Sequence, residues 1–135
     1  MRDLKLIYLM FFIGVGSVVL GLPYALKIFG PTEAVVALWG RTSVFIGILL
    51  IISSFALRPV KTKAIKFLLA LEFSILALLQ VFPIFFWIVM YGQGITDLPY
   101  QPGDFIAHWG YSIPHLIIFV NAVLVIYLLL RNAKD

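Results

Sequence analysis

The sequence predicts an all-α protein that crosses a membrane as a four-helix transmembrane bundle. Three observations support this fold class: 63% of the 135 residues are hydrophobic, only 12% are charged, and the apolar residues form four long stretches. A soluble domain of this size needs more polar surface than such a composition offers. We therefore expect a single membrane domain over residues 1–135, with the lipid bilayer as its surroundings.

Four apolar stretches come close to the roughly 20 residues that a membrane-spanning helix needs. They cover residues 6–22, 34–57, 67–91 and 112–130. Pro23 is predicted to end the first stretch, and Pro83 is predicted to kink the third because proline removes a backbone hydrogen bond. A basic start followed by an apolar run is also typical of a signal peptide. No cleavage site of the A-x-A type follows it, so we expect the first helix to be retained.

The basic residues predict the orientation of these helices. Eight lysines and arginines lie in the N-terminal segment, the second connection and the C-terminal segment, whereas the other two connections hold only Lys27 and Arg41. Because cytoplasmic loops are rich in Lys and Arg, a multi-pass protein of the cell membrane with both termini in the cytoplasm is predicted. The basic residues either follow this rule alone or also bind anionic headgroups. They adjoin the spans rather than a soluble module, so nucleic acid is not an expected partner.

Small residues predict how the first two helices meet. Both stretches carry three of them at positions i, i+3 and i+7: Gly14, Ser17 and Gly21 in the first, and Gly40, Ser43 and Gly47 in the second. Small residues let helices approach closely in lipid. An antiparallel hairpin of the first two helices is the simplest outcome, and the alternative places one of these faces in a homodimer interface. Phe and Leu dominate the third and fourth stretches, which are expected to be lipid-facing walls.

Aromatic and turn-forming residues mark the predicted outer end of the bundle. Amphipathic rings favour the membrane interface, so four residues are expected there as anchors: Trp39, Trp87, Tyr91 and Trp109. In the longest connection, residues 92–112, Asp104 directly follows a Pro-Gly pair. This order predicts that Asp104 caps a short helical turn that ends before Gly110. Pro114 disfavours helical geometry at the residue before it, so a break near this point is also expected.

Three polar side chains lie within the predicted spans. Glu72 lies roughly 9 Å along the third helix from Lys66, where an ionised carboxylate is costly. It either accepts a proton or a cation as part of a function, or pairs with a basic residue at the cytoplasmic rim. Gln80 and Asn121 are expected to face the bundle interior. They either join helices by hydrogen bonds or line a polar cavity with Glu72.

Two histidines and an arginine are candidates near the outer end. His108 and His115 are seven residues apart and share one face of a continuous helix. A structural zinc site needs four ligands, so no metal is expected, and the sequence identifies no cofactor. The histidines are either interfacial residues or part of an external polar site with Asp104. Arg41 either binds a carboxylate or phosphate through its planar guanidinium or extends to the interface.

The segment GRTSVFIG, residues 40–47, resembles the start of the second helix in DoxX-like small membrane proteins. Proteins of that family also have four spans and a similar length, and some of them are linked to quinone or thiosulfate oxidation complexes. The resemblance implies a four-span fold and marks Arg41 and Gly47 as residues to test.

These observations favour a binding or accessory membrane subunit that holds a small or lipid-like ligand within the helix bundle. Glu72 and Gln80 would contribute from within, and Arg41, His108 and His115 from the outer end. One alternative is a small proton- or cation-coupled transporter that uses Glu72. Another is a membrane enzyme with an external site of His, Arg and Asp residues. A homodimer or a larger membrane complex is the expected assembly.

Overall fold

The computed structural model of the chain describes residues 2–28, 34–56, 62–91 and 104–132, and these are almost all helical. The elements are α1 (Arg2–Ala25), α2 (Ala34–Ala56), α3 (Lys63–Phe85), the π-helix η1 (Phe86–Tyr91) and α4 (Asp104–Asn132). Within the described ranges, four helices are long and apolar enough to cross a membrane. This confirms the predicted all-α class with four candidate spans.

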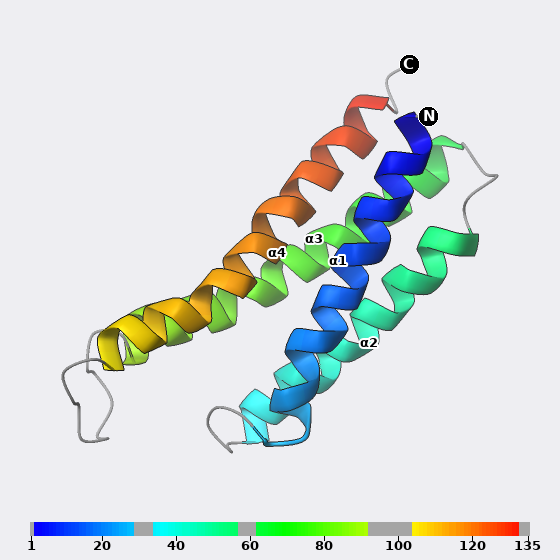
Figure 1. Cartoon of the computed structure of the whole chain (residues 1–135). Coiled ribbons are helices and arrows are strands. Elements are labelled where there is room, and N and C mark those ends of the chain that lie inside the picture. The colour runs from blue at the N-terminus through cyan, green and yellow to red at the C-terminus, as the bar shows by residue number, and fades with distance from the viewer. Residues whose placement is uncertain (1, 29–33, 57–61, 92–103, 133–135) are drawn as a thin grey trace.

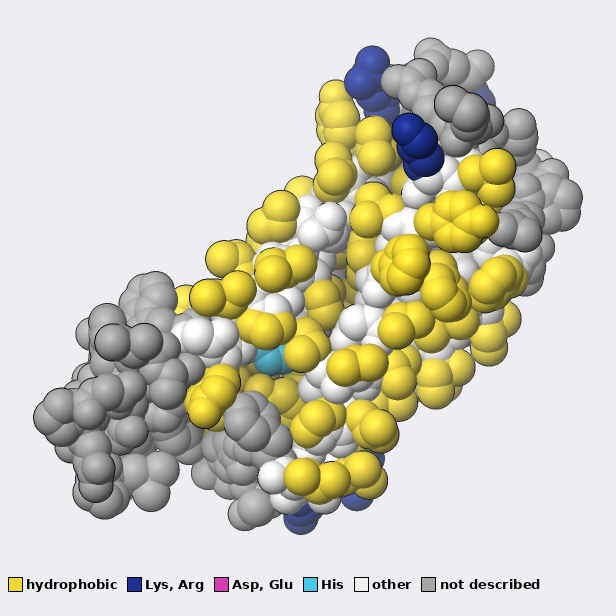
Figure 2. Space-filling view, in the orientation of Figure 1, with side chains coloured by type: hydrophobic (Ala, Val, Ile, Leu, Met, Phe, Trp, Pro, Cys, Tyr) yellow, Lys and Arg dark blue, Asp and Glu magenta, His cyan; other side chains and the backbone are white. Residues whose placement is uncertain are grey.

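The helices form two antiparallel hairpins, α1 with α2 and α3 with α4, which cross each other at an angle (Figure 1). The starts of α1 and α3 and the end of α4 lie at one end of the molecule, which we call the terminal end. The end of α1 and the starts of α2 and α4 lie at the other end, which we call the turn end. On the face shown in Figure 2, basic side chains occupy the two ends and apolar side chains cover the surface between them. This distribution suits a bilayer.

Helices α1 and α2 meet through the small residues that the sequence singled out. A Cβ atom placed on Gly47 would lie 2.7 Å from the carbonyl oxygen of Gly14, and one placed on Gly21 would lie 2.8 Å from the carbonyl oxygen of Gly40. Only glycine allows two backbones to approach this closely. The predicted hairpin is therefore confirmed. Within one chain the two small-residue faces pack against each other, and a homodimer interface stays a prediction.

Two serines lie at the centre of this contact between α1 and α2, which we call the α1–α2 seam. The Ser17 hydroxyl donates to the backbone carbonyl of Ser43 at 2.9 Å, and the Ser43 hydroxyl donates to the carbonyl of Ser17 at 3.2 Å. Both side chains are fully buried. The reciprocal bonds satisfy two hydroxyl groups that would be costly to leave unpaired in a membrane.

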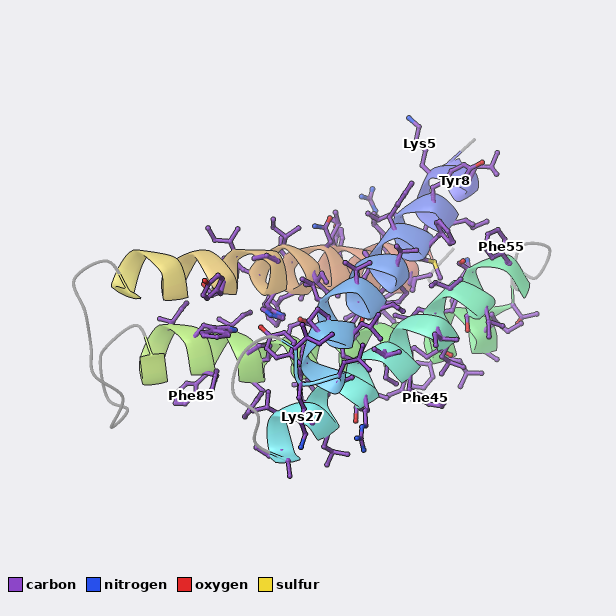
Figure 3. All side chains as sticks on the ribbon, turned by 60° about the horizontal axis from the view of Figure 1, so that its bottom comes forward. Lys5, Tyr8, Lys27, Phe45, Phe55 and Phe85 are labelled. Atoms are coloured by element: carbon purple, nitrogen blue, oxygen red, sulfur yellow. The ribbon has the colours of Figure 1, made fainter. Side chains whose placement is uncertain are left out.

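The hydrophobic core draws on all four helices and lies largely between α3 and α4. Phe73 and Leu76 of α3 and Ala122 and Val125 of α4 are completely buried in it. Helices α3 and α4 were expected to form lipid-facing walls; each exposes an apolar outer face, and its other face builds the core. Exposed apolar residues still cover the outside, as Phe45 of the first hairpin and Phe85 of the second illustrate (Figure 3).

Three prolines lie inside helices, and two of them, Pro23 and Pro114, do not have the predicted effect. Helix α1 does not end at Pro23 but continues to Ala25. Beyond that residue, Lys27 adopts a left-handed conformation with φ 57°, and the Ile28 amide donates to the Pro23 carbonyl at 2.9 Å. This is the hydrogen-bond pattern of a Schellman cap, in which the left-handed residue is usually glycine.

The predicted short turn before Gly110 and the predicted break at Pro114 are wrong. Helix α4 does begin at Asp104, but it continues through both residues to Asn132. In α3, the chain changes from α-helix to π-helix three residues after Pro83. Neighbouring helices in a bundle compensate for the backbone bonds that proline removes, so helical geometry survives inside the protein.

Candidate functional site

A buried group of aromatic and polar side chains lies toward the turn end, and both hairpins contribute to it. We call it the His115 cluster, and its members are Tyr24 (α1), Trp39 (α2), Gln80 (α3), Trp87 (η1) and His115 (α4). His115 and Gln80 are only 1% and 0% exposed. Full burial of a histidine and a glutamine requires hydrogen-bond partners, because an unpaired polar group in such a place is costly.

A directional chain of hydrogen bonds links four of these residues. The Trp87 indole N–H donates to the Tyr24 hydroxyl oxygen at 2.9 Å. The Tyr24 hydroxyl lies 3.4 Å from Nε2 of His115, and Nδ1 of His115 lies 2.9 Å from Oε1 of Gln80. An amide oxygen only accepts, so Nδ1 carries the proton and Nε2 of the neutral imidazole accepts from Tyr24. The chain therefore runs from Trp87 through Tyr24 and His115 to Gln80.

Trp39 forms a wall of the cluster and ties the two hairpins together. Its ring packs edge-on against His115 at 5.4 Å and against Tyr24 at 5.3 Å between ring centroids. Its indole N–H donates to the backbone carbonyl of Leu79 at 2.6 Å. In an α-helix that carbonyl would accept from the residue four positions later, which here is Pro83 and has no N–H. Pro83 thus frees the acceptor that Trp39 uses.

These contacts correct two predictions about the tryptophans. Trp39 and Trp87 were expected to be interfacial anchors, but both are buried among residues of the opposite hairpin. Tyr91 and Trp109, expected in the same role, lie where side chains are outside the described part of the structure. Trp87, which bonds Tyr24, lies in the π-helical turn η1, and such turns are frequent at functional sites.

The Gln80 side chain has one unsatisfied group. Its Oε1 is paired with His115, but its Nε2 is buried and has no hydrogen-bond partner. A buried donor without an acceptor costs about 1–3 kcal/mol. The cluster therefore presents an N–H donor inside the protein, beside the rings of the His115 cluster, to any acceptor atom that enters.

Glu72 lies apart from this cluster. It is eight residues before Gln80, or roughly 12 Å along the helix toward the terminal end. The Ser53 hydroxyl of α2 lies 3.5 Å from Oε1 of Glu72, while Oε2 is buried without a partner. One of the two predictions for Glu72 was a pair with a basic residue at the cytoplasmic rim. Within the described residues, its hydrogen-bond partner is a serine instead.

Among the remaining predicted site residues, only Asn121 and Arg41 have described side chains, and neither belongs to the His115 cluster. Asn121 donates to the Ile117 carbonyl of its own helix at 2.8 Å, so its described hydrogen bond joins no other helix, and a cavity shared with Glu72 stays a prediction. Arg41 is exposed on α2, whereas His115 is enclosed. Asp104 and His108 belong to α4, but their side chains lie outside the described part of the structure.

Sequence reasoning missed the roles of Tyr24, Trp39 and Trp87. A signal for Trp39 was present, because Pro83 necessarily leaves the carbonyl of Leu79 without its helical donor. Tyr24 lies directly after Pro23, where the helix was expected to end. Tyr24 reaches the His115 cluster only because α1 continues for a last turn, and nothing in the sequence indicated this.

Comparison with known proteins found no matching family model, no similar curated protein and no similar solved structure. The resemblance of α2 to DoxX-like proteins therefore stays a prediction. Among the residues that the structure describes, no group of three His, Cys, Asp or Glu residues lies close enough to hold a metal ion. The fold and the His115 cluster define a helical protein with four candidate membrane spans and a buried polar site between its two hairpins.

Proposed function

We propose that this membrane protein is a binding or accessory subunit. It would hold a small or lipid-like ligand between its two hairpins, at the His115 cluster. The observation that carries the proposal is the Nε2 atom of Gln80, a donor buried without a partner. A ligand with a carbonyl, ether or hydroxyl oxygen would satisfy this donor. Its apolar part would pack against the aromatic rings that surround His115.

The packing of the helices supports a site at this position. Each hairpin is closely packed within itself, and the two hairpins contact each other less extensively. Ligand sites in helix bundles commonly lie between helices and combine apolar walls with a few polar groups. The His115 cluster has this composition, and a ligand could reach it by a small separation of the hairpins without breaking the α1–α2 seam.

Native mass spectrometry of the protein released from gentle detergent tests the proposal. Gln80→Met keeps the size of the side chain and removes the free donor. Asn121→Leu is the matched control, because it removes an intramembrane amide that bonds only within its own helix among the described residues. We expect a bound molecule on the wild type and the control but not on Gln80→Met. The same adduct on all three proteins, or none on the wild type, would overturn the proposal.

Glu72 supports a second candidate function, a small proton- or cation-coupled transporter. Its Oε2 atom is buried without a partner and its only described hydrogen bond is a long one from Ser53. Such a carboxylate in a membrane span is a common carrier of protons. In proteoliposomes, Glu72→Gln should abolish coupled flux if this candidate is right, with Ser53→Ala as a milder variant. Flux that is unchanged in Glu72→Gln would exclude it.

We also propose that the terminal end faces the cytoplasm of a cell membrane. In the described part of the structure, Lys5, Lys63, Lys66 and Arg131 belong to that end. Lys27 and Arg41 belong to the turn end, which fits the positive-inside rule. The chain has no cysteine, so one introduced at Arg131 can be labelled with an impermeant maleimide. Labelling only after permeabilisation is expected, and labelling of intact cells would contradict the proposal.

A further inference from the structure

Arg41 lies on a face of α2 that is turned away from the bundle. Leu38, Phe45 and Ile48 are three residues before, four after and seven after it, so they share this face, and all are exposed. Arg41 is exposed as well. It makes no hydrogen bond or ion pair with the rest of the described chain. A charged guanidinium surrounded by lipid-facing apolar residues requires an anionic partner or access to water.

The depth of Arg41 favours an anionic partner at the level of lipid headgroups. It is seven residues into α2, or roughly 10 Å from the helix start at the turn end. Side chains of a helix lean toward its N-terminus, which for α2 is the turn end. A long arginine side chain therefore reaches back toward the headgroup region. Glu72 is the one carboxylate whose side chain is described within the spans. It lies in the half of α3 nearer the terminal end, away from Arg41.

An apolar groove lies between α2 and α3 and shares Leu38 with the exposed face that carries Arg41. Its volume is about 290 Å³, and its lining consists of Val35, Leu38, Trp39, Thr42 and Phe82. The Thr42 hydroxyl donates to the Leu38 carbonyl of its own helix at 2.9 Å, so it offers the groove no free donor. An open apolar groove with a cation on the neighbouring helix face suits an acyl chain joined to a phosphate.

We propose that one anionic phospholipid of the bilayer binds here, with its phosphate on Arg41 and one acyl chain in the α2–α3 groove. Arginine suits phosphate because its planar guanidinium forms two parallel hydrogen bonds. The site is distinct from the one proposed at Gln80: Trp39 separates them, lining the groove and also contacting His115 in the cluster. A lipid in the groove would pack against the side of Trp39 that faces away from His115.

The test uses the full chain in nanodiscs with equal amounts of phosphatidylglycerol and phosphatidylcholine, followed by native mass spectrometry of the retained lipid. The wild type should retain one phosphatidylglycerol. Arg41→Gln should lower its occupancy about tenfold or more, the effect of losing charge-assisted hydrogen bonds. Val35→Trp, which fills the groove without a change in charge, should lower it similarly. Both positions are exposed, so neither variant should unfold the protein.

Two control variants show whether the lipid binds at this site or elsewhere on the protein. Lys27→Gln removes the other described basic side chain of the turn end, and Gln80→Met removes the donor of the His115 cluster; both should retain the phosphatidylglycerol. Equal retention of the two lipids, or unchanged retention in Arg41→Gln, would overturn the proposal. Unchanged retention in Val35→Trp would overturn the placement of the acyl chain. Loss in Gln80→Met would show that the lipid occupies the His115 cluster instead.

Discussion

The α1–α2 seam brings two backbones into direct contact, whereas the interface between the hairpins is built from large side chains joined by hydrogen bonds. At the seam, Gly14, Gly21, Gly40 and Gly47 leave no room for a side chain, and the buried serine hydroxyls are fully paired. At the other interface, aromatic rings and a histidine fill the space and one donor is left over. The difference indicates that close backbone packing holds the α1–α2 hairpin together, whereas the interface between the hairpins leaves one buried donor unpaired.

The largest effect should come from a side chain placed in the seam. Gly40→Ala would put a Cβ atom 2.7 Å from the Gly21 carbonyl oxygen and 2.9 Å from the Tyr24 carbonyl carbon. Backbone atoms cannot move aside without separating the hairpin, so we expect a loss of about 2–3 kcal/mol in the free energy of unfolding. Thermal or SDS unfolding in detergent measures it.

Gly110 provides the matched control for this substitution. A Cβ atom added to it meets no other atom within 4 Å, and the residue lies inside α4. Gly110→Ala should therefore be neutral or should stabilise the helix by about 0.5–1 kcal/mol. If Gly40→Ala behaved like Gly110→Ala, close backbone contact would not be what holds the seam.

Removal of the Tyr24 hydroxyl should disrupt the chain of hydrogen bonds at the interface between the two hairpins. Tyr24→Phe deletes the acceptor for the Trp87 indole and the donor to His115, and leaves both groups buried. We expect a loss of about 2 kcal/mol in unfolding free energy, the cost of unsatisfied polar groups. Tyr127→Phe is the control, since Tyr127 is 58% exposed on α4. Equal stability of the two variants would refute the hydrogen-bonded chain.

The bond between Trp39 and Leu79 can be tested with a double-mutant cycle. Trp39→Phe keeps an aromatic ring beside His115 but removes the indole donor, which should cost about 1–1.5 kcal/mol. Pro83→Ala restores an N–H that can bond the Leu79 carbonyl within the helix. The cost of Trp39→Phe should therefore be smaller in the Pro83→Ala background. Additive effects of the two substitutions would contradict the role assigned to Pro83.

The smallest effect should appear at the end of α1, which delivers Tyr24 to the cluster. Lys27 has a left-handed backbone, which costs roughly 1 kcal/mol in a residue with a Cβ atom. Lys27→Gly should raise the free energy of unfolding by about that amount. Lys27→Ala removes the same charge but keeps the strained backbone, so it should not stabilise the protein. A gain in both variants would point to charge rather than to backbone conformation.

The sequence predicted the seam better than the site, for a physical reason. The spacing of Gly14, Ser17 and Gly21 fixes one helix face regardless of what packs against it, so the hairpin was predictable. The His115 cluster depends on the crossing of two hairpins and on a proline-freed carbonyl, which no single helix reveals. The described bond of Asn121 stays within α4, because the side of α4 that meets the bundle depends on the rotation of that helix about its axis.

Predictions from local helix preferences were also wrong where the packing of the bundle keeps the backbone helical. Pro23 and Pro114 disfavour helix in water, but inside a membrane bundle the backbone has no better alternative than to stay helical. Gln80 and His115 were both singled out from the sequence, and the structure joins them directly. That they bind a ligand stays a proposal.

The measurement that tests the central claim most directly is an experimental density map of the protein purified in gentle detergent. We predict density for a non-protein molecule between the hairpins, with an acceptor atom about 3 Å from Nε2 of Gln80. The same map of Gln80→Met should lack it. A side chain of the protein, or a single water molecule, bonded to Nε2 in the wild type would contradict ligand binding and make the His115 cluster a structural element alone.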